Sequence, residues 1–85
     1  MAELTVSVAA DREVWSGVAK QIVARTTEGE IGILPGHEPL LGILGAGEVR
    51  ITPTEGAVVT ARAEDGFLSV ENNTVTIVAG AAELL

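Results

Sequence analysis

Apolar and polar residues alternate along much of this 85-residue chain. At the start of the sequence Leu4, Val6 and Val8 alternate with Glu3 and polar residues, so their side chains would share one face of a strand. The apolar residues are mainly Val, Ile and Ala, and β-branched side chains favour a pleated, half-buried sheet. This period of two predicts a strand at the N-terminus and an all-β protein.

Turn-forming residues divide the rest of the chain into short segments. We predict a turn at residues 15–17 and strands over residues 18–27, 48–52, 57–64, 67–71 and 74–78, with short strands joined by a proline-containing turn between residues 30 and 41. Reversals are expected at residues 45–47, 53–56, 65–66 and 72–73, where Gly, Pro, Asp and Asn cluster. The last residues, 79–85, favour helix by composition, so a helix should begin there without completing.

An antiparallel sheet with one apolar face must cover that face with another sheet. The segments therefore predict a flattened two-sheet antiparallel β-sandwich or barrel, formed by residues 1–85 as one domain. Such a short chain has little room for both a core and an enclosed substrate cavity, which favours a binding or coupling module over an enzyme.

Charge and composition narrow the possible functions. Five Lys and Arg stand against twelve Asp and Glu, giving a net charge of −7, which argues against direct binding to nucleic acid or to anionic membrane lipids. The absence of cysteine excludes disulfides and thiolate metal sites, and a single histidine cannot form a histidine cluster. No signal peptide or membrane-spanning apolar run is present, so we expect a soluble cytosolic protein without direct membrane insertion.

Catalytic interpretations have little support in the sequence. His37 is the one residue able to serve as the base of a nucleophilic triad, and no serine lies in a strained elbow. The serines that would have to reach it are Ser7, Ser16 and Ser69. The neighbouring carboxylates Glu28 and Glu30 are explained by a solvated turn, and no phosphate-binding loop follows the glycines. We predict no catalytic residue, no cofactor and no metal.

Two non-catalytic interpretations remain open at this point. One is a swinging-arm carrier, which would attach lipoate or biotin to a lysine in an exposed hairpin turn. Lys20 is the only lysine, and it falls inside a predicted strand. Residues 34–41, LPGHEPLL, form a turn of fixed shape that suits either a docking loop or a corner between sheets.

This loop resembles the epsilon subunit of the rotary F-type ATP synthase. Residues 29–40, GEIGILPGHEPL, reproduce the most specific signature of that family, and residues 15–17, WSG, are similar to its aromatic-Ser-Gly turn. Residues 47–51, 66–70 and 75–79 follow in the order and spacing of the family. The resemblance covers nearly the whole chain.

The resemblance implies a non-catalytic rotor subunit, located peripherally at the cytoplasmic face of the bacterial cell membrane. Its partners would be the gamma subunit and the c-ring, and it would couple rotation of the ring to ATP synthesis. By the same resemblance the contact with the c-ring falls on Glu28, Gly29 and Glu30, and the contact with gamma on His37, Leu41 and Gly42.

The family usually continues into an inhibitory C-terminal helical hairpin, which we expect to be absent from this chain. The alternative function is a small-molecule-binding β-barrel or a lipoyl or biotinyl carrier. That function requires an enclosed apolar cavity or a modified Lys20.

Overall fold

Six strands make up the regular structure of the computed structural model, which describes residues 3–85 and, for residue 46, the backbone alone. The strands are β1 (Leu4–Ala9), β2 (Glu13–Thr26), β3 (Gly29–Ile33), β4 (Leu40–Pro53), β5 (Val59–Glu71) and β6 (Thr74–Leu84). The described part of the chain contains no helix. This confirms the all-β class that the β-branched composition predicts.

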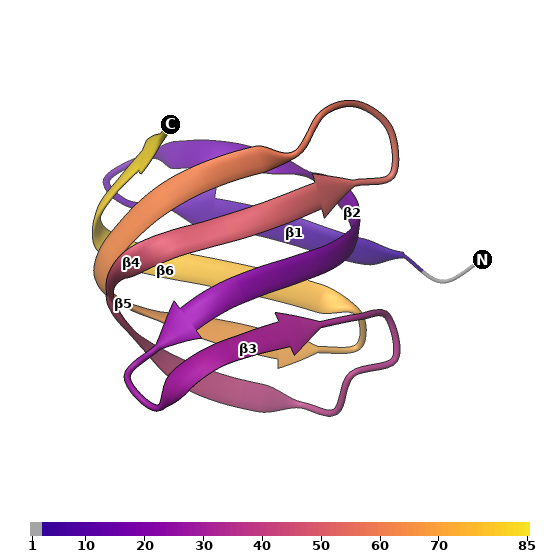
Figure 1. Ribbon diagram of the computed structural model, residues 1–85, viewed down its shortest axis with the longest axis horizontal. Helices are drawn as coiled ribbons and strands as arrows, with labels where there is room; N and C mark the ends of the chain where they lie inside the picture. The colour runs from indigo at the N-terminus through magenta and orange to yellow at the C-terminus, as the bar shows by residue number, and fades with distance from the viewer. Residues whose placement is uncertain (1–2) are drawn as a thin grey trace.

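The strands form one sheet that closes on itself. Their order is β1-β6-β5-β4-β2-β3, and β1 also pairs with β2. The long strands β2, β4 and β5 bend from one side of the molecule to the other, so that two layers face each other (Figure 1). The molecule measures 33 × 25 × 19 Å, and this flattened barrel confirms the predicted two-layer β-sandwich.

One pair of neighbouring strands differs from the predicted antiparallel arrangement. β1 pairs with β6 in parallel, with Val6 opposite Val75 and Val8 opposite Ile77, whereas the other pairs are antiparallel. Side chains alternate in the same way in both kinds of pair, so the sequence pattern carries no signal of direction.

Three of the predicted turns are wrong, because they lie inside continuous strands. Residues 15–17 belong to β2, residues 45–47 to β4, and residues 65–66 to β5. The last two segments lie opposite each other where β4 and β5 bend between the layers, at the left of Figure 1. Asp65 has a φ of 56°, and a side chain at Gly66 would collide with the backbone of Val78 and Ala79. Here the turn-forming residues bend a strand and do not reverse the chain.

The C-terminal residues also differ from the prediction. β6 continues to Leu84 and pairs with β5, with Ala63 opposite Ala82 and Ala61 opposite Leu84. The predicted helix start is therefore wrong, because hydrogen bonding to a neighbouring strand outweighs the weak helix preference of Ala, Glu and Leu. By contrast the turn at Asn72 and Asn73 is confirmed, with positive φ at both residues.

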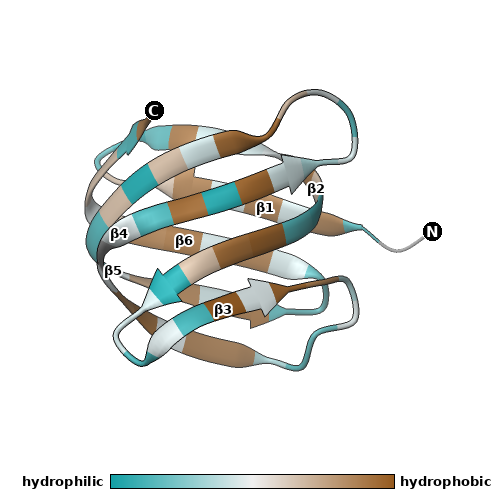
Figure 2. Cartoon of the chain, in the orientation of Figure 1, coloured by the Kyte–Doolittle hydropathy of each residue, from teal (hydrophilic) through white to brown (hydrophobic). Residues whose placement is uncertain are grey.

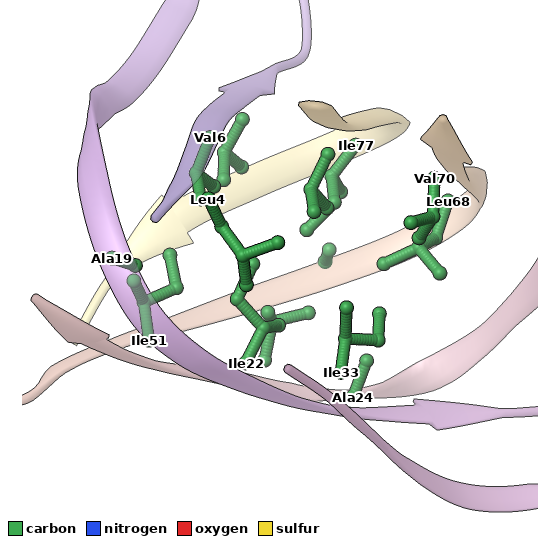
Figure 3. Close-up of a cluster of buried hydrophobic side chains, with 14 of the residues drawn as sticks. Leu4, Val6, Ala19, Ile22, Ala24, Ile33, Ile51, Leu68, Val70 and Ile77 are labelled. Atoms are coloured by element: carbon green, nitrogen blue, oxygen red, sulfur yellow. The ribbon is translucent and has the colours of Figure 1, made fainter. Parts of the chain in front are cut away.

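The core fills the space between the layers. Leu4, Val6 and Val8 are buried, as the alternation at the N-terminus predicts. Figure 3 shows Leu4 and Val6 pointing inward, toward apolar side chains from β2, β5 and β6. The cluster comprises Leu4, Val6, Val8, Ala19, Ile22, Ala24, Ile33, Leu44, Val49, Ile51, Ala63, Leu68, Val70, Val75, Ile77 and Ala79. Among the described residues no polar or charged side chain is buried. The polar groups that carry function therefore lie on the surface.

Candidate functional site

The proline-glycine loop between β3 and β4 has a defined hydrogen-bonded shape. The backbone N–H of His37 donates to the carbonyl oxygen of Leu34 at 3.1 Å, with Pro35 second in the turn and Gly36 third. Gly36 has a φ of 88°, the conformation that the third residue of a type II turn requires. The N–H of Gly36 donates to the side-chain oxygen of Asn73 at 2.7 Å, so the loop is also tied to the β5–β6 turn.

His37 lies half-buried in this loop. Its Nδ1 is 2.7 Å from the carbonyl oxygen of Glu38, which can only accept, so Nδ1 donates. No hydrogen bond joins His37 to a serine within residues 3–85. The ring orientation is thus fixed by the loop itself.

The β2–β3 turn and the start of β3 carry the predicted ring-facing residues. Thr26 Oγ1 donates to the carbonyl oxygen of Gly29 at 2.8 Å and accepts from the N–H of Glu28 at 3.2 Å. Gly29 has a φ of 123°, which favours glycine. Glu28, Gly29 and Glu30 are all exposed. The backbone N–H of Thr27 donates to the carbonyl oxygen of Ile43 at 2.9 Å, which joins the turn directly to β4.

The two predicted contact regions meet along the first part of β4. A groove of about 290 Å³ is lined by residues 26–28, by Ile31 and by residues 40–43. Leu41 is 69% exposed and points outward, whereas a side chain at Gly42 would point toward Thr26 and Leu68. The structure therefore brings Glu28, Leu41 and Gly42 to the lining of one groove, where a side chain at Gly42 would lie against Thr26.

Glu30 faces a different surface from Glu28. It is the register partner of Arg25 and lines a second hollow of about 490 Å³. We call this surface the charged face; its charged side chains are Arg25, Glu30, Glu48, Arg50, Arg62 and Glu64. An exposed ion pair of 3.8 Å between Arg62 Nη1 and Glu83 Oε1 borders it.

An exposed apolar row next to Leu41 was missed in the sequence interpretation. Ile43, Phe67 and Val78 are register partners across β4, β5 and β6, and their side chains are exposed. Leu41 lies beside them and is in register with Ser69, which is in register with Thr76. We call this surface the uncharged face; it consists of Leu41, Ile43, Phe67, Ser69, Thr76 and Val78.

The contrast between the two faces follows the bend in β4. Figure 2 shows the first part of β4 as a mostly hydrophobic band, whereas hydrophilic bands cross its second part. The sequence does carry a signal for the uncharged face. At residues 40–44, 67–68 and 77–78 consecutive residues are apolar, so both faces of these strand segments carry apolar side chains. Such runs are typical of strands that are covered on both faces.

The structure also gives the positions of the residues that bear on a carrier function, a metal site or a membrane-spanning helix. Lys20 is exposed within β2, at a register shift between Ala19 and Gln21, and not in a hairpin turn. Residues 3–85 include no group of three or more His, Asp or Glu side chains arranged to hold a metal ion. Over the same residues no helix is long and apolar enough to span a membrane.

Residues 3–85 match the family model described as ATP synthase, Delta/Epsilon chain, beta-sandwich domain. The chain belongs to this family. The match covers all of the described residues, and it confirms the resemblance that the loop signature indicates. Within the Delta/Epsilon family, the closed barrel described above is the beta-sandwich domain.

Curated relatives in the Delta/Epsilon family are similar to the chain over nearly all of its length. The ATP synthase epsilon chain of Streptomyces coelicolor is 54% identical over 84 residues, which are 98% of this chain and 68% of that relative. The epsilon chain of Micrococcus luteus is 52% identical over 85 residues, which are 99% of this chain and 93% of that relative.

Solved structures of ATP synthases contain chains with this fold. A chain of the Euglena gracilis mitochondrial ATP synthase, in a structure of OSCP, F1 and the c-ring, matches with a TM-score of 0.90 and 25% identity. That match covers 99% of this chain and 54% of the other. A chain from the central stalk and c-ring of the Tetrahymena thermophila enzyme matches in fold alone, with a TM-score of 0.77 and 20% identity, over 93% of this chain and 64% of the other.

Proposed function

We propose that this chain is a non-catalytic rotor subunit that attaches the gamma subunit to the c-ring and so couples ring rotation to ATP synthesis. The observation that carries the proposal is the presence of an exposed apolar face beside an acidic turn on one closed barrel. In this arrangement the subunit is peripheral, at the cytoplasmic face of the bacterial membrane, and catalysis belongs to other subunits. The similar Euglena chain was solved within an assembly containing F1 and the c-ring.

The uncharged face supports the gamma contact. Leu41 and Ile43 are 69% and 56% exposed, and they adjoin Phe67 and Val78 in a single patch. A contiguous exposed apolar patch on a small domain is typical of a protein interface, because its burial removes apolar area from water. The proposed contact also includes His37, in the proline-glycine loop, and Gly42, in the first part of β4.

The β2–β3 turn is the proposed contact with the c-ring. Glu28 and Glu30 project carboxylates on either side of Gly29, and all three residues are exposed. Carboxylates at such a turn suit the polar loops of a ring through charge-assisted hydrogen bonds. Because Thr27 is hydrogen-bonded to Ile43, a load on this turn passes directly to the strand that carries the gamma contact.

Coupling requires a domain that does not yield under torque. The sheet closes through the β1–β2 pair, and the space between its layers is filled by tightly packed apolar side chains. Close-packed protein interiors are hard to compress and transmit strain. The barrel is thus suited to carry rotation from the ring-facing turn to the gamma-facing strand.

The 85 residues are proposed to perform this attachment without the inhibitory helical hairpin. The relative from Micrococcus luteus is matched over 93% of its own length. Added to an epsilon-depleted enzyme, the chain should restore proton-coupled ATP synthesis without suppressing ATP hydrolysis. Strong inhibition of hydrolysis would contradict this part of the proposal.

A binding experiment with purified gamma tests the proposal as a whole. We expect gel filtration to show a complex on mixing, and mass spectrometry to give the unmodified mass of the chain. A prosthetic-group increment on Lys20, together with no complex, would indicate the carrier function instead.

A further inference from the structure

Asn73 connects three segments that are distant in the sequence. Its side-chain oxygen accepts from the N–H of Gly36 at 2.7 Å, across 37 positions, and its carbonyl oxygen accepts from the N–H of Thr5 at 2.8 Å. Asn73 itself lies in the tight β5–β6 turn with a φ of 58°. The residue therefore joins the proline-glycine loop to a turn that is anchored on β1.

The hydrogen bond between Gly36 and Asn73 fixes the orientation of the loop relative to the barrel, which the loop's own backbone bond does not fix. Residues 34–39 connect β3 to β4, and their internal backbone bond runs from the N–H of His37 to the oxygen of Leu34. That bond closes the turn but does not fix its direction relative to the barrel. The bond from Gly36 to Asn73 does so, because Asn73 belongs to a different pair of strands.

We propose that Asn73 is a positioning residue, which holds the Leu34–His37 turn in the orientation that presents His37 and the start of β4 to the gamma subunit. This inference rests on the proposed function, in which the same loop contacts gamma. A loop that is ordered before binding loses less conformational entropy on binding. Loss of the bond should therefore weaken the association with gamma while leaving the barrel folded.

The neighbouring Asn72 provides a matched control. Asn72 and Asn73 have φ values of 49° and 58°, so glycine fits both positions without strain. Both glycine variants remove one asparagine side chain from the same turn, but only Asn73→Gly removes the acceptor of the Gly36 N–H. Asn73→Asp retains an acceptor oxygen at the same position and tests rescue.

The first measurement uses the unbound chain. NMR should show amide exchange at Gly36 accelerated roughly two- to tenfold in Asn73→Gly, the range expected for loss of one hydrogen bond. Asn72→Gly and Asn73→Asp should leave exchange at Gly36 within about twofold of the unaltered chain. Equal exchange at Gly36 in both glycine variants would overturn the positioning role, whatever the outcome with gamma.

The second measurement is the dissociation constant for purified gamma. Asn73→Gly should raise the dissociation constant by roughly two- to tenfold, whereas Asn72→Gly and Asn73→Asp should leave it unchanged. The two glycine variants should have similar thermal midpoints of unfolding. Faster exchange at Gly36 with unchanged gamma affinity would overturn the inference. Failure of the unaltered chain to bind gamma would instead count against the proposed function, and the exchange measurement separates the two failures.

Discussion

The indole ring of Trp15 lies across Gly17, two residues further along β2. A β-carbon built on Gly17 would lie 2.9 Å from Cη2 and 3.0 Å from Cζ2 of that ring, closer than carbon atoms normally approach. Trp15 packs against the core in the same region, where β2 pairs with β1. The glycine therefore provides the space in which the single tryptophan of the chain covers this end of the barrel.

Replacing this glycine should destabilise the barrel. Gly17→Ala must move the outer edge of the half-buried indole ring, and we expect a cost of about 1 kcal/mol of unfolding free energy, the lower end of the range for overpacking. Urea unfolding monitored by the fluorescence of Trp15 gives the value. Gly32→Ala is the matched control, because Gly32 lies in β3 with no atom within 4 Å of its added β-carbon. Equal stability of the two variants would show that the indole does not require Gly17.

The uncharged face should account for gamma affinity. Phe67→Ala removes the largest side chain of the exposed row and should weaken gamma binding by about 1–2 kcal/mol, as truncation of an interface aromatic residue does. Val58→Ala provides a control, because Val58 is also exposed but lies in the β4–β5 loop, outside this face. Isothermal titration with gamma measures both. Equal effects of the two variants would argue against a contact at Phe67.

Charge reversal in the β2–β3 turn should weaken ring binding. Glu28→Lys and Glu30→Lys replace exposed carboxylates at the proposed contact, and each should lower affinity for the isolated c-ring by about two- to fivefold, the scale of an exposed ion pair. Glu55→Lys makes the same charge change in the β4–β5 loop, at the opposite end of β4 (Figure 1). The prediction fails if a ring-binding assay finds no difference between the turn variants and Glu55→Lys.

A large side chain at Gly42 should disturb both contacts together. The β-carbon of an added side chain would lie 3.4 Å from Cγ2 of Thr26, so Gly42→Ala fits, whereas Gly42→Leu must displace Thr26. Thr26 holds the β2–β3 turn through its hydroxyl, and we expect Gly42→Leu to lower stability by about 1–3 kcal/mol. Binding to gamma and to the c-ring should both decrease, and undiminished co-purification of Gly42→Leu with gamma would refute this expectation.

Local patterns predicted the features that depend on neighbouring residues. The inward face of Leu4, Val6 and Val8 follows from alternation alone, and the reversal at Asn72 and Asn73 follows from their tolerance of positive φ. The family signature at residues 29–40 likewise requires no knowledge of tertiary contacts.

Features that depend on distant partners were not predictable in this way. Glycine and aspartate carry the same local signal in a reversal and in a bend, so the sequence predicts a turn at Gly66, whereas its close approach to the backbone of Val78 depends on the tertiary structure. Phe67 is followed by the core residue Leu68, and its exposed neighbour Ile43 comes from a strand 24 positions earlier, so the apolar runs at these residues do not reveal that the two side chains lie in one surface patch. The link from Gly36 to Asn73 likewise depends on where β5 and β6 turn.

Under the proposed function, the difference between the two faces should give the barrel a preferred orientation toward gamma during assembly. Contact through the charged face would dehydrate three guanidinium groups and three carboxylates, at a cost of several kcal/mol for each ion without a matching partner charge. Contact through the uncharged face dehydrates hydroxyl groups and hydrocarbon alone. If gamma binds the uncharged face as proposed, this dehydration cost disfavours the orientation in which the barrel presents its charged face to gamma.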